Sequence, residues 1–510
     1  MKRLFVLGIL SALMATLLPS QAGAQQVPPT PPRDQWYAEN DTGHWSDGTR
    51  VRIDESCLGL PQSEQVACSM EAFRAKPFTV IAFVDSGINP YHQDFRAPEF
   101  THHPAEYVEG YPEAAEAVDL SFDVADESGY AAAREADDET LFGIARNRLH
   151  WFPGTRIIGG YSTGAGGSGA YPETAIIDEN GHGTGVASVA AGRFFGANPN
   201  ALIVMVEALG GASLNWATSQ PWIDIVSNSW GNIGNVPLGS ADPTREATDR
   251  GQTVAFAAGN GTTNTNSHRV CVPATAVCTP PVWSDNGGPA PIEDPCKCKT
   301  PDSNPSLTSP YGGPSWVLTV GATSPINGQP HWWHSIPVDV SSFGSKWRAA
   351  AYDGVQREHD RDFGGTSCAT PVTSGVLSGI IEHAREVLGD TVGGQRPEQV
   401  VAQAADGAEL PTAGPLADGV LTRTEAEAIV TKTAFPVPAD PETIPWDYAV
   451  RPTTGTPIDS AIQGYGVVDA DSRARAHAVL MGEAELPDRT DADQVIAAFD
   501  QLRDAVWGTV

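Results

Sequence analysis

Basic side chains are scarce in this chain. Its 510 residues include 31 Lys and Arg against 62 Asp and Glu, which gives a formal net charge of −31 at pH 7. Nucleic acids and anionic membrane surfaces are bound by clustered Lys and Arg, so this balance argues against both as partners. Charged residues make up only 18% of the chain, whereas apolar residues make up 41% and can fill a large core, which argues against a wholly disordered protein.

Long hydrophobic runs are missing after the first 18 residues, so we expect no later membrane span. The run Leu4–Leu18 is itself short for a span. It follows Lys2 and Arg3 and precedes the small residues Ala22-Gly23-Ala24, which is the order found in signal peptides. The alternative is an uncleaved anchor. We expect residues 1–24 to be removed and the protein to be secreted, in an extracellular or periplasmic location.

The seven cysteines lack the paired CxxC arms that are typical of a zinc site. In an exported protein they favour disulfide bonds. Cys57 and Cys68 form a local candidate pair, and Cys368 is left over. Four others lie in one segment rich in Pro, Gly and Asp, where three pairings are possible and a zinc site is the alternative: Cys271, Cys278, Cys296 and Cys298.

Several short apolar runs are nearly continuous, which is typical of strands covered on both faces of a parallel sheet. They are Thr79–Val84, Leu202–Val206, Trp222–Val226, Thr253–Ala258 and Trp316–Val320. Helical patterns lie between and after them. The clearest begins at Pro371 and has an apolar face of Val372, Val376, Leu377, Ile380, Ile381 and Ala384. The alternation predicts an α/β fold, a doubly wound and mostly parallel sheet flanked by helices, with sites at the carboxyl ends of strands.

Two segments interrupt this alternation and are interpreted as surface insertions. Residues 97–155 are rich in Glu, Asp and Ala, and residues 262–314 are rich in Pro, Gly, Asn and Cys. We therefore expect an amino-terminal segment over residues 25–72 and an α/β domain over residues 73–480. Residues 481–510 form a carboxyl-terminal tail that contains one amphipathic helix.

Three residues stand in settings suited to nucleophilic catalysis. Asp85 ends a predicted buried strand and is followed by Ser-Gly. His182 lies between two glycines, which leave room for a substrate backbone, at the start of a predicted helix. Ser367 follows Gly-Gly-Thr at a helix amino terminus, where free N–H groups stabilise developing negative charge. Each residue alone also has a structural explanation, such as an N-cap for the serine.

Together the three segments resemble the signatures of the subtilisin-like serine peptidases. The matching residues are Asp85-Ser86-Gly87, Gly181-His182-Gly183-Thr184 and Gly365-Thr366-Ser367-Cys368-Ala369-Thr370-Pro371. Their order along the chain is that of subtilisin. The resemblance implies a subtilisin-like peptidase domain and a secreted serine endopeptidase. Such an enzyme hydrolyses polypeptides through a triad of Asp85, His182 and Ser367 and an acyl-enzyme intermediate.

Two further segments match that family. Ser229-Trp230-Gly231 resembles its substrate-binding segment, to which an extended substrate adds as a strand. The alternative to a binding role for Trp230 is that it is an ordinary core residue. Ala257-Ala258-Gly259-Asn260 resembles the oxyanion-hole segment, in which Asn260 donates its side-chain amide. The resemblance implies that catalysis requires no cofactor. It allows structural calcium, for which the sequence identifies no ligands. We expect a monomer.

The sequence departs from the family at two positions near the signatures. Gly185 stands where many members have a second His, and Cys368 stands where many have Met. Cys368 is an alternative nucleophile, but its place in the signature favours a small buried residue. Only 60 residues separate Ala24 from Asp85, so we do not expect a full prodomain.

Two other classes of function compete with the peptidase. A pseudoenzyme or binding module would keep the fold, but the four intact residues Asp85, His182, Ser367 and Asn260 argue against it. An α/β-hydrolase esterase would need Gly-x-Ser-x-Gly and the chain order Ser, Asp, His, and the sequence has neither at Ser367.

Overall fold

A computed structural model describes residues 53–113, 116–117, 147–163, 176–194, 196–231, 243–260, 314–323, 338–345, 347–355, 361–390, 398–437, 463–469 and 471–503. Several sequence predictions lie outside these ranges. They are the signal peptide, nearly all of the insertion over residues 262–314 with its four cysteines, and the centre of the insertion over residues 97–155. The boundaries of the amino-terminal segment, the domain and the tail stay predictions.

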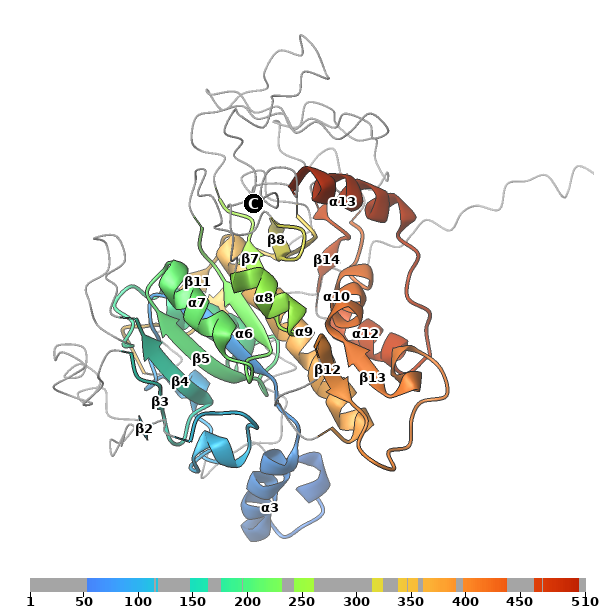
Figure 1. Ribbon diagram of the computed structural model, residues 1–510. Helices are drawn as coiled ribbons and strands as arrows, with labels where there is room; N and C mark the ends of the chain where they lie inside the picture. Colours follow the sequence, from blue (N-terminus) through green and yellow to red (C-terminus); the bar gives the residue numbers. More distant parts are fainter. Residues whose placement is uncertain are drawn as a thin grey trace, which may run out of the picture.

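A single large sheet forms the centre of the fold (Figure 1), and the described chain contributes ten strands to it in the order β14-β9-β8-β7-β6-β1-β5-β4-β3-β2. The strands are β1 (Val80–Asp85), β2 (Glu116–Ala117), β3 (His150–Trp151), β4 (Ile157–Ser162), β5 (Leu202–Glu207), β6 (Ile225–Asn228), β7 (Thr253–Ala257), β8 (Leu318–Thr323), β9 (Val340–Phe343) and β14 (Val467–Val468). Neighbouring strands run parallel except β3 and β4, which are antiparallel. The predicted doubly wound, mostly parallel sheet is therefore confirmed.

Helices cover both faces of this sheet. On one face lie α6 (His182–Ala191), α9 (Thr366–Leu388), α10 (Arg423–Lys432) and α12 (Ser472–Leu480), and on the other lie α7 (Gly211–Ser219) and α8 (Pro243–Asp249). Side chains of one strand alternate between the two layers. In β1, Ile81 and Phe83 face the α9 layer, whereas Val80, Ala82 and Val84 face α7. Burial on both faces explains why the strand sequences are continuously apolar.

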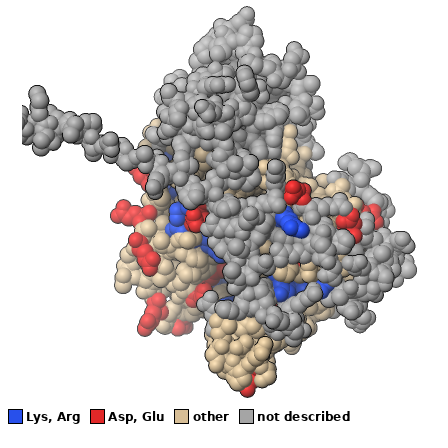
Figure 2. Space-filling model, turned by 180° about the vertical axis from the view of Figure 1, so that it is seen from behind, with Lys and Arg blue, Asp and Glu red and all other residues tan. Residues whose placement is uncertain are grey.

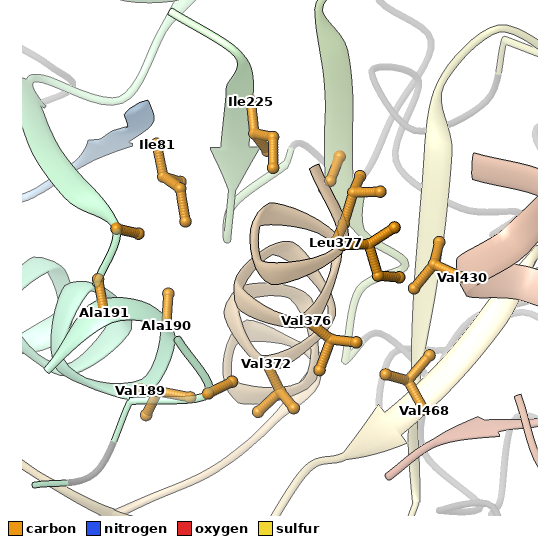
Figure 3. Close-up of a cluster of buried hydrophobic side chains, with 14 of the residues drawn as sticks. Ile81, Val189, Ala190, Ala191, Ile225, Val372, Val376, Leu377, Val430 and Val468 are labelled. Carbon is orange, nitrogen blue, oxygen red and sulfur yellow. The ribbon is translucent and has the colours of Figure 1, made fainter. Parts of the chain in front are cut away.

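The amphipathic helix predicted from Pro371 is the middle of α9, and all six residues of its predicted apolar face are buried. Figure 3 shows Val372, Val376 and Leu377 of this helix among side chains from the strands and from α6. In the run Trp222–Val226 the strand begins later than predicted, at Ile225 of β6. Trp222 and Ile223 are buried in the connection that precedes β6, so burial rather than strand pairing accounts for their apolar character.

The strand order reverses around β1. The strands β4 and β5 lie on one side of it, and β6 to β9 follow one another on the other side. Ligand sites in such sheets lie outside the carboxyl ends of the strands at this switch point. Asp85 is the last residue of β1, which places it at that point.

The described part of the amino-terminal segment leads into α3 (Gln62–Ala75), shown in blue at the bottom of Figure 1. A disulfide joins Cys57 and Cys68, as the sequence predicted. Lys76, which directly follows α3, forms an ion pair with Asp54. The tail contains α13 (Thr490–Arg503), which confirms that a helix forms there.

Two small antiparallel pairs complete the described strands. They are β10 (Trp347–Ala349) with β11 (Arg361–Phe363), and β12 (Val400–Gln403) with β13 (Val420–Thr422). None of the helices in the described ranges has the length and the apolar character that a membrane span requires.

The excess of acidic residues is visible on the described surface. Seen from behind, acidic side chains spread over one flank, with few basic side chains nearby (Figure 2). Exposed carboxylates of the carboxyl-terminal elements include Asp406, Glu409, Asp418, Glu483, Glu485 and Asp488. Like charges on a surface favour solubility and repel other copies of the chain.

Candidate active site

Three elements bring the predicted catalytic residues to one edge of the sheet. Asp85 ends β1, His182 is the first residue of α6, and Ser367 is the second residue of α9. The loop after β1 and the start of α6 approach closely. A Cβ atom on Gly183 would lie 2.1 Å from the carbonyl oxygen of Gly87, so the glycine in the histidine signature is a steric requirement.

Asp85 and His182 are hydrogen-bonded to each other. Nδ1 of His182 lies 2.8 Å from Oδ1 of Asp85, and that oxygen also accepts the backbone N–H of Ser86 at 2.8 Å. Asp85 is 1% exposed, whereas the imidazole keeps 31% of its surface exposed. Oδ2 of Asp85 is buried and accepts no hydrogen bond from the described part of the chain. This arrangement leaves Nε2 of His182 as the nitrogen available to a substrate.

The charge of Asp85 also changes the acidity of the imidazole. Burial by itself lowers the pKa of His182, but the charge and the hydrogen bond of Asp85, together with the charge of Asp178, outweigh it and raise that pKa above its ordinary value. The imidazole is therefore a stronger base than a free histidine, and it holds a proton more readily in acid.

Ser367 is paired with Ser229 through two hydrogen bonds. The hydroxyl of Ser367 donates to the carbonyl oxygen of Ser229 at 3.0 Å, and the hydroxyl of Ser229 donates to the carbonyl oxygen of Ser367 at 3.0 Å. The second bond has a simple cause. Pro371 lies four residues further along α9 and has no N–H, so the carbonyl of Ser367 lacks its helical donor.

No hydrogen bond joins Ser367 to His182 within the described ranges; the structure connects only Asp85 and His182 directly. Phe363 links the two regions by packing. It lies four residues before Ser367, and its ring meets the imidazole edge-on with 5.3 Å between centroids. Hydrogen bonds at catalytic sites are often made only when substrate is bound, so the missing bond does not argue against a pairing of Ser367 with His182.

Asn260 is oriented by Thr366, the residue before Ser367. Its Oδ1 accepts both the N–H of Thr366 at 3.0 Å and the hydroxyl of Thr366 at 2.9 Å. The Thr366 hydroxyl in turn accepts the N–H of Gly259 at 3.2 Å. The amide nitrogen is therefore turned away from Thr366. It lies 3.0 Å from the position of a Cβ on Gly365, and it donates to none of the described residues.

The predicted substrate-binding segments follow two neighbouring strands. Ser229–Gly231 comes after β6, and Ala258–Asn260 comes after β7, with which β6 pairs in parallel. Both segments therefore emerge at the same edge of the sheet as Asp85. The ring of Trp230 packs edge-on against Phe256, with 5.5 Å between centroids.

The two departures from the family pattern have physical explanations. A Cβ atom on Gly185 would lie 2.9 Å from the ring of Phe363, so the glycine leaves the space that this ring occupies beside His182. Cys368 is fully buried, and burial raises the pKa of its thiol far above the ordinary value. A buried, protonated thiol is a poor nucleophile, which argues against Cys368 in that role.

Sequence reasoning missed four residues that hold the site together. Thr366 and Ser86 stand within the quoted signatures, but no role was assigned to them. Asp178 lies just before the histidine signature, and Phe363 belongs to no signature. Their roles depend on partners distant in the chain, so no local pattern identifies them. The described residues contain no group of three or more His, Cys, Asp or Glu side chains arranged to hold a metal ion.

Most of the chain matches a known protein family. The sequence profile of the subtilase family (peptidase S8) matches residues 78–466, which is about three quarters of the chain. No curated protein sequence matches the chain.

The solved structures that are similar to this fold include two serine peptidases. One is the epidermin leader peptide processing serine protease (EpiP) from Staphylococcus aureus, with 14% identity and a TM-score of 0.39 over 79% of this chain and 77% of that one. The other is a cold adapted subtilisin-like serine proteinase, with 17% identity and a TM-score of 0.36 over 77% of this chain and 89% of that one.

Proposed function

The chain belongs to the subtilase family and is a serine-type endopeptidase, and we propose that Asp85, His182 and Ser367 are its catalytic triad. The observation that carries this assignment is the 2.8 Å hydrogen bond between His182 and Asp85 at the switch point of the sheet. Ser367 lies at the amino terminus of α9, at the same edge.

In the proposed mechanism, Nε2 of His182 takes the proton of the Ser367 hydroxyl as the oxygen attacks the scissile carbonyl carbon. Nδ1 keeps its own proton and donates it in a hydrogen bond to Asp85, whose negative charge stabilises the imidazolium that forms. The imidazolium then gives its proton to the leaving amine, and the peptide bond breaks to leave an acyl-enzyme on Ser367. A water molecule, activated by the same imidazole, hydrolyses that ester and restores the serine.

We also assign the oxyanion hole. The side-chain amide of Asn260 donates to the carbonyl oxygen as that oxygen gains charge, because Thr366 already occupies its Oδ1. The second donor is the backbone N–H of Ser367, which lies in the first turn of α9 and has no helical partner. Both donors are fixed before substrate binds, so they need no rearrangement during the reaction.

We further propose that this peptidase is exported and acts in an oxidising compartment. The Cys57–Cys68 disulfide supports this location, since such bonds persist outside the cytosol. Every group that the mechanism uses is a side chain or a backbone amide, so we propose that catalysis needs no cofactor. Dialysis against EDTA at low temperature is expected to leave kcat unchanged.

The test of the triad uses two adjacent substitutions. We expect Ser367→Ala to abolish cleavage of a peptide library read by mass spectrometry, and Cys368→Ala to keep it. A serine-directed phosphonate should label the wild-type protein at Ser367 and leave the Ser367→Ala variant unlabelled. Cleavage that survives in the Ser367→Ala variant, or a wild-type protein that is neither labelled nor active, would contradict the proposal.

A further inference from the structure

Asp178 is a buried carboxylate that the proposed mechanism does not use. It lies four residues before His182, and none of its surface is exposed. Removing a charge from water is costly unless hydrogen bonds replace the lost solvation. The contacts of this carboxylate therefore indicate what the fold gains from it.

Four of the hydrogen bonds to Asp178 come from the turn that carries His182. Oδ1 accepts the N–H groups of Asn180 at 2.9 Å and Gly181 at 2.8 Å. Oδ2 accepts the N–H of Thr184 at 2.8 Å and its hydroxyl at 2.6 Å. Gly181 is the N-cap of α6 and has no side chain to cap the helix. The Asp178 carboxylate takes over this role, at the positive end of the helix dipole.

A fifth hydrogen bond reaches Asp178 from the segment that carries Asp85. The hydroxyl of Ser86, 92 residues away in the chain, donates to Oδ1 at 3.0 Å. The same hydroxyl oxygen accepts the N–H of Gly183 at 2.9 Å, and the N–H of Ser86 donates to Asp85 at 2.8 Å. Ser86 is thus hydrogen-bonded to both carboxylates and to Gly183, the residue that follows His182.

We propose that Asp178 is a positioning residue, which holds the imidazole of His182 at Asp85 by clamping Ser86 to the first turn of α6. This inference rests on the proposed role of His182 as the base. Asp178 acts only through His182 and takes no part in the bond-making steps. Without the clamp, the loop after β1 and the first turn of α6 lose the two hydrogen bonds that the Ser86 hydroxyl makes, and the bond from the N–H of Asn89 to the Thr184 hydroxyl at 3.0 Å remains.

Besides clamping Ser86, Asp178 acts on the imidazole of His182 through its charge. Burial lowers the pKa of His182, and the charged groups of the described chain that raise it are Asp85, at the end of β1, and Asp178. Neutralising Asp178 should therefore lower the pKa of His182 and move the acid limb of kcat/KM to lower pH.

The decisive measurement is an NMR titration of His182 in the inactive Ser367→Ala background, with Asp178→Asn added. His182→Gln identifies the resonance among the 12 histidines. We expect the proton affinity of His182 to fall at least about threefold, since an opposite charge is removed from its surroundings. A folded Asp178→Asn variant with an unchanged His182 titration would overturn the proposal.

Asp94→Asn is the matched control. Asp94 is as buried as Asp178 and lies at the other end of α6, where it accepts the hydroxyl of Ser188 at 2.6 Å and the N–H of Phe194 at 2.7 Å. Ser188 lies about 9 Å along the helix axis from His182, given 1.5 Å per residue. We expect this variant to lose stability without a change in the His182 titration. An equal shift in both variants would assign the effect to general destabilisation and overturn the proposal.

Ser86→Ala decides the question if Asp178→Asn does not fold, because it keeps both carboxylates and removes only the hydroxyl between them. We expect kcat to fall about tenfold or more through misplacement of the base, with KM within about twofold. The acid limb should move to lower pH, because the imidazole loses part of its contact with Asp85. Ser86→Thr, which keeps a hydroxyl, should recover most of the loss. Wild-type kcat in Ser86→Ala would overturn the clamp.

Failure of the proposed function gives a different result from failure of this inference. If His182 is not the base, the His182→Gln variant of the otherwise wild-type enzyme stays active. The NMR titration is made in a background that does not cleave peptides, so it reports the effect of Asp178 on the imidazole whatever the catalytic role of His182.

Discussion

Replacing Asn260 by Asp separates its catalytic role from its structural one. The carboxylate keeps an acceptor for the N–H and hydroxyl of Thr366, which lie 3.0 and 2.9 Å from Oδ1. In place of the amide donor it presents a second negative oxygen to the developing oxyanion. Asn260→Ala instead removes both functions and leaves the buried Thr366 donors without their acceptor, at a cost of about 1–3 kcal/mol each.

The two variants should therefore rank in opposite order for activity and for stability. Loss of the donor costs about 10²–10³ in kcat, the range known for the asparagine of the subtilisin oxyanion hole. Two like charges about 3 Å apart add about 1 kcal/mol of repulsion in water and about 5 kcal/mol at an effective dielectric constant of 20. Asn260 is exposed, which favours the lower figure, so Asn260→Asp should lose about 10³ or more in kcat.

The assay measures kcat and KM on a chromogenic peptide amide at pH 8, and thermal unfolding in the Ser367→Ala background. We expect Asn260→Asp to melt near the parent temperature and Asn260→Ala to melt lower. Asn215→Asp, on the exposed side of α7, controls for one added charge and should leave kcat unchanged. Retention of more than a tenth of wild-type kcat in Asn260→Asp, or an activity order that follows stability, would refute the reasoning.

Three further predictions follow from the contacts of the site and of the amino-terminal segment. The value of kcat/KM should fall tenfold per pH unit below a pKa above about 6.5, because His182 must be neutral to act as a base and its pKa is raised. Gly185→Ala should lower both kcat and the melting temperature, since its Cβ would lie 2.9 Å from the Phe363 ring and overpacking costs about 1–3 kcal/mol. Replacing Cys57 and Cys68 by Ser should destabilise the α3 segment by about 3 kcal/mol through loop entropy, with little effect on kcat.

Each of these predictions has its own control. A pH profile that stays flat to pH 5 would exclude His182 as the base. Gly211→Ala provides the comparison for Gly185→Ala, because a Cβ there meets nothing within 4 Å and should cost little. For the disulfide, urea unfolding followed with and without a reductant should differ in the wild type and coincide in the double Ser variant.

Local patterns were sufficient where one segment determined the outcome. The continuous apolar runs predicted β1, β5 and β7, because strands covered on both faces have no solvent-facing side that would carry polar residues. The face of α9 was predicted because a helix repeats every 3.6 residues whatever it packs against. The same reasoning placed the strand at Trp222 too early, since an apolar side chain buried in a connection looks the same in sequence as one buried in a strand.

The amino-acid sequence by itself determined the sheet class, the faces of the main helix, the local disulfide and the identities of Asp85, His182, Ser367 and Asn260 as candidates. Only the tertiary structure decided what orients them. The bond from Thr366 to Asn260 spans 106 residues, and the bond from Ser86 to Asp178 spans 92. Such contacts depend on how the sheet edge brings distant loops together. The sequence around a hydroxyl or a carboxylate does not identify its hydrogen-bond partner, because only folding sets the distance between the two groups.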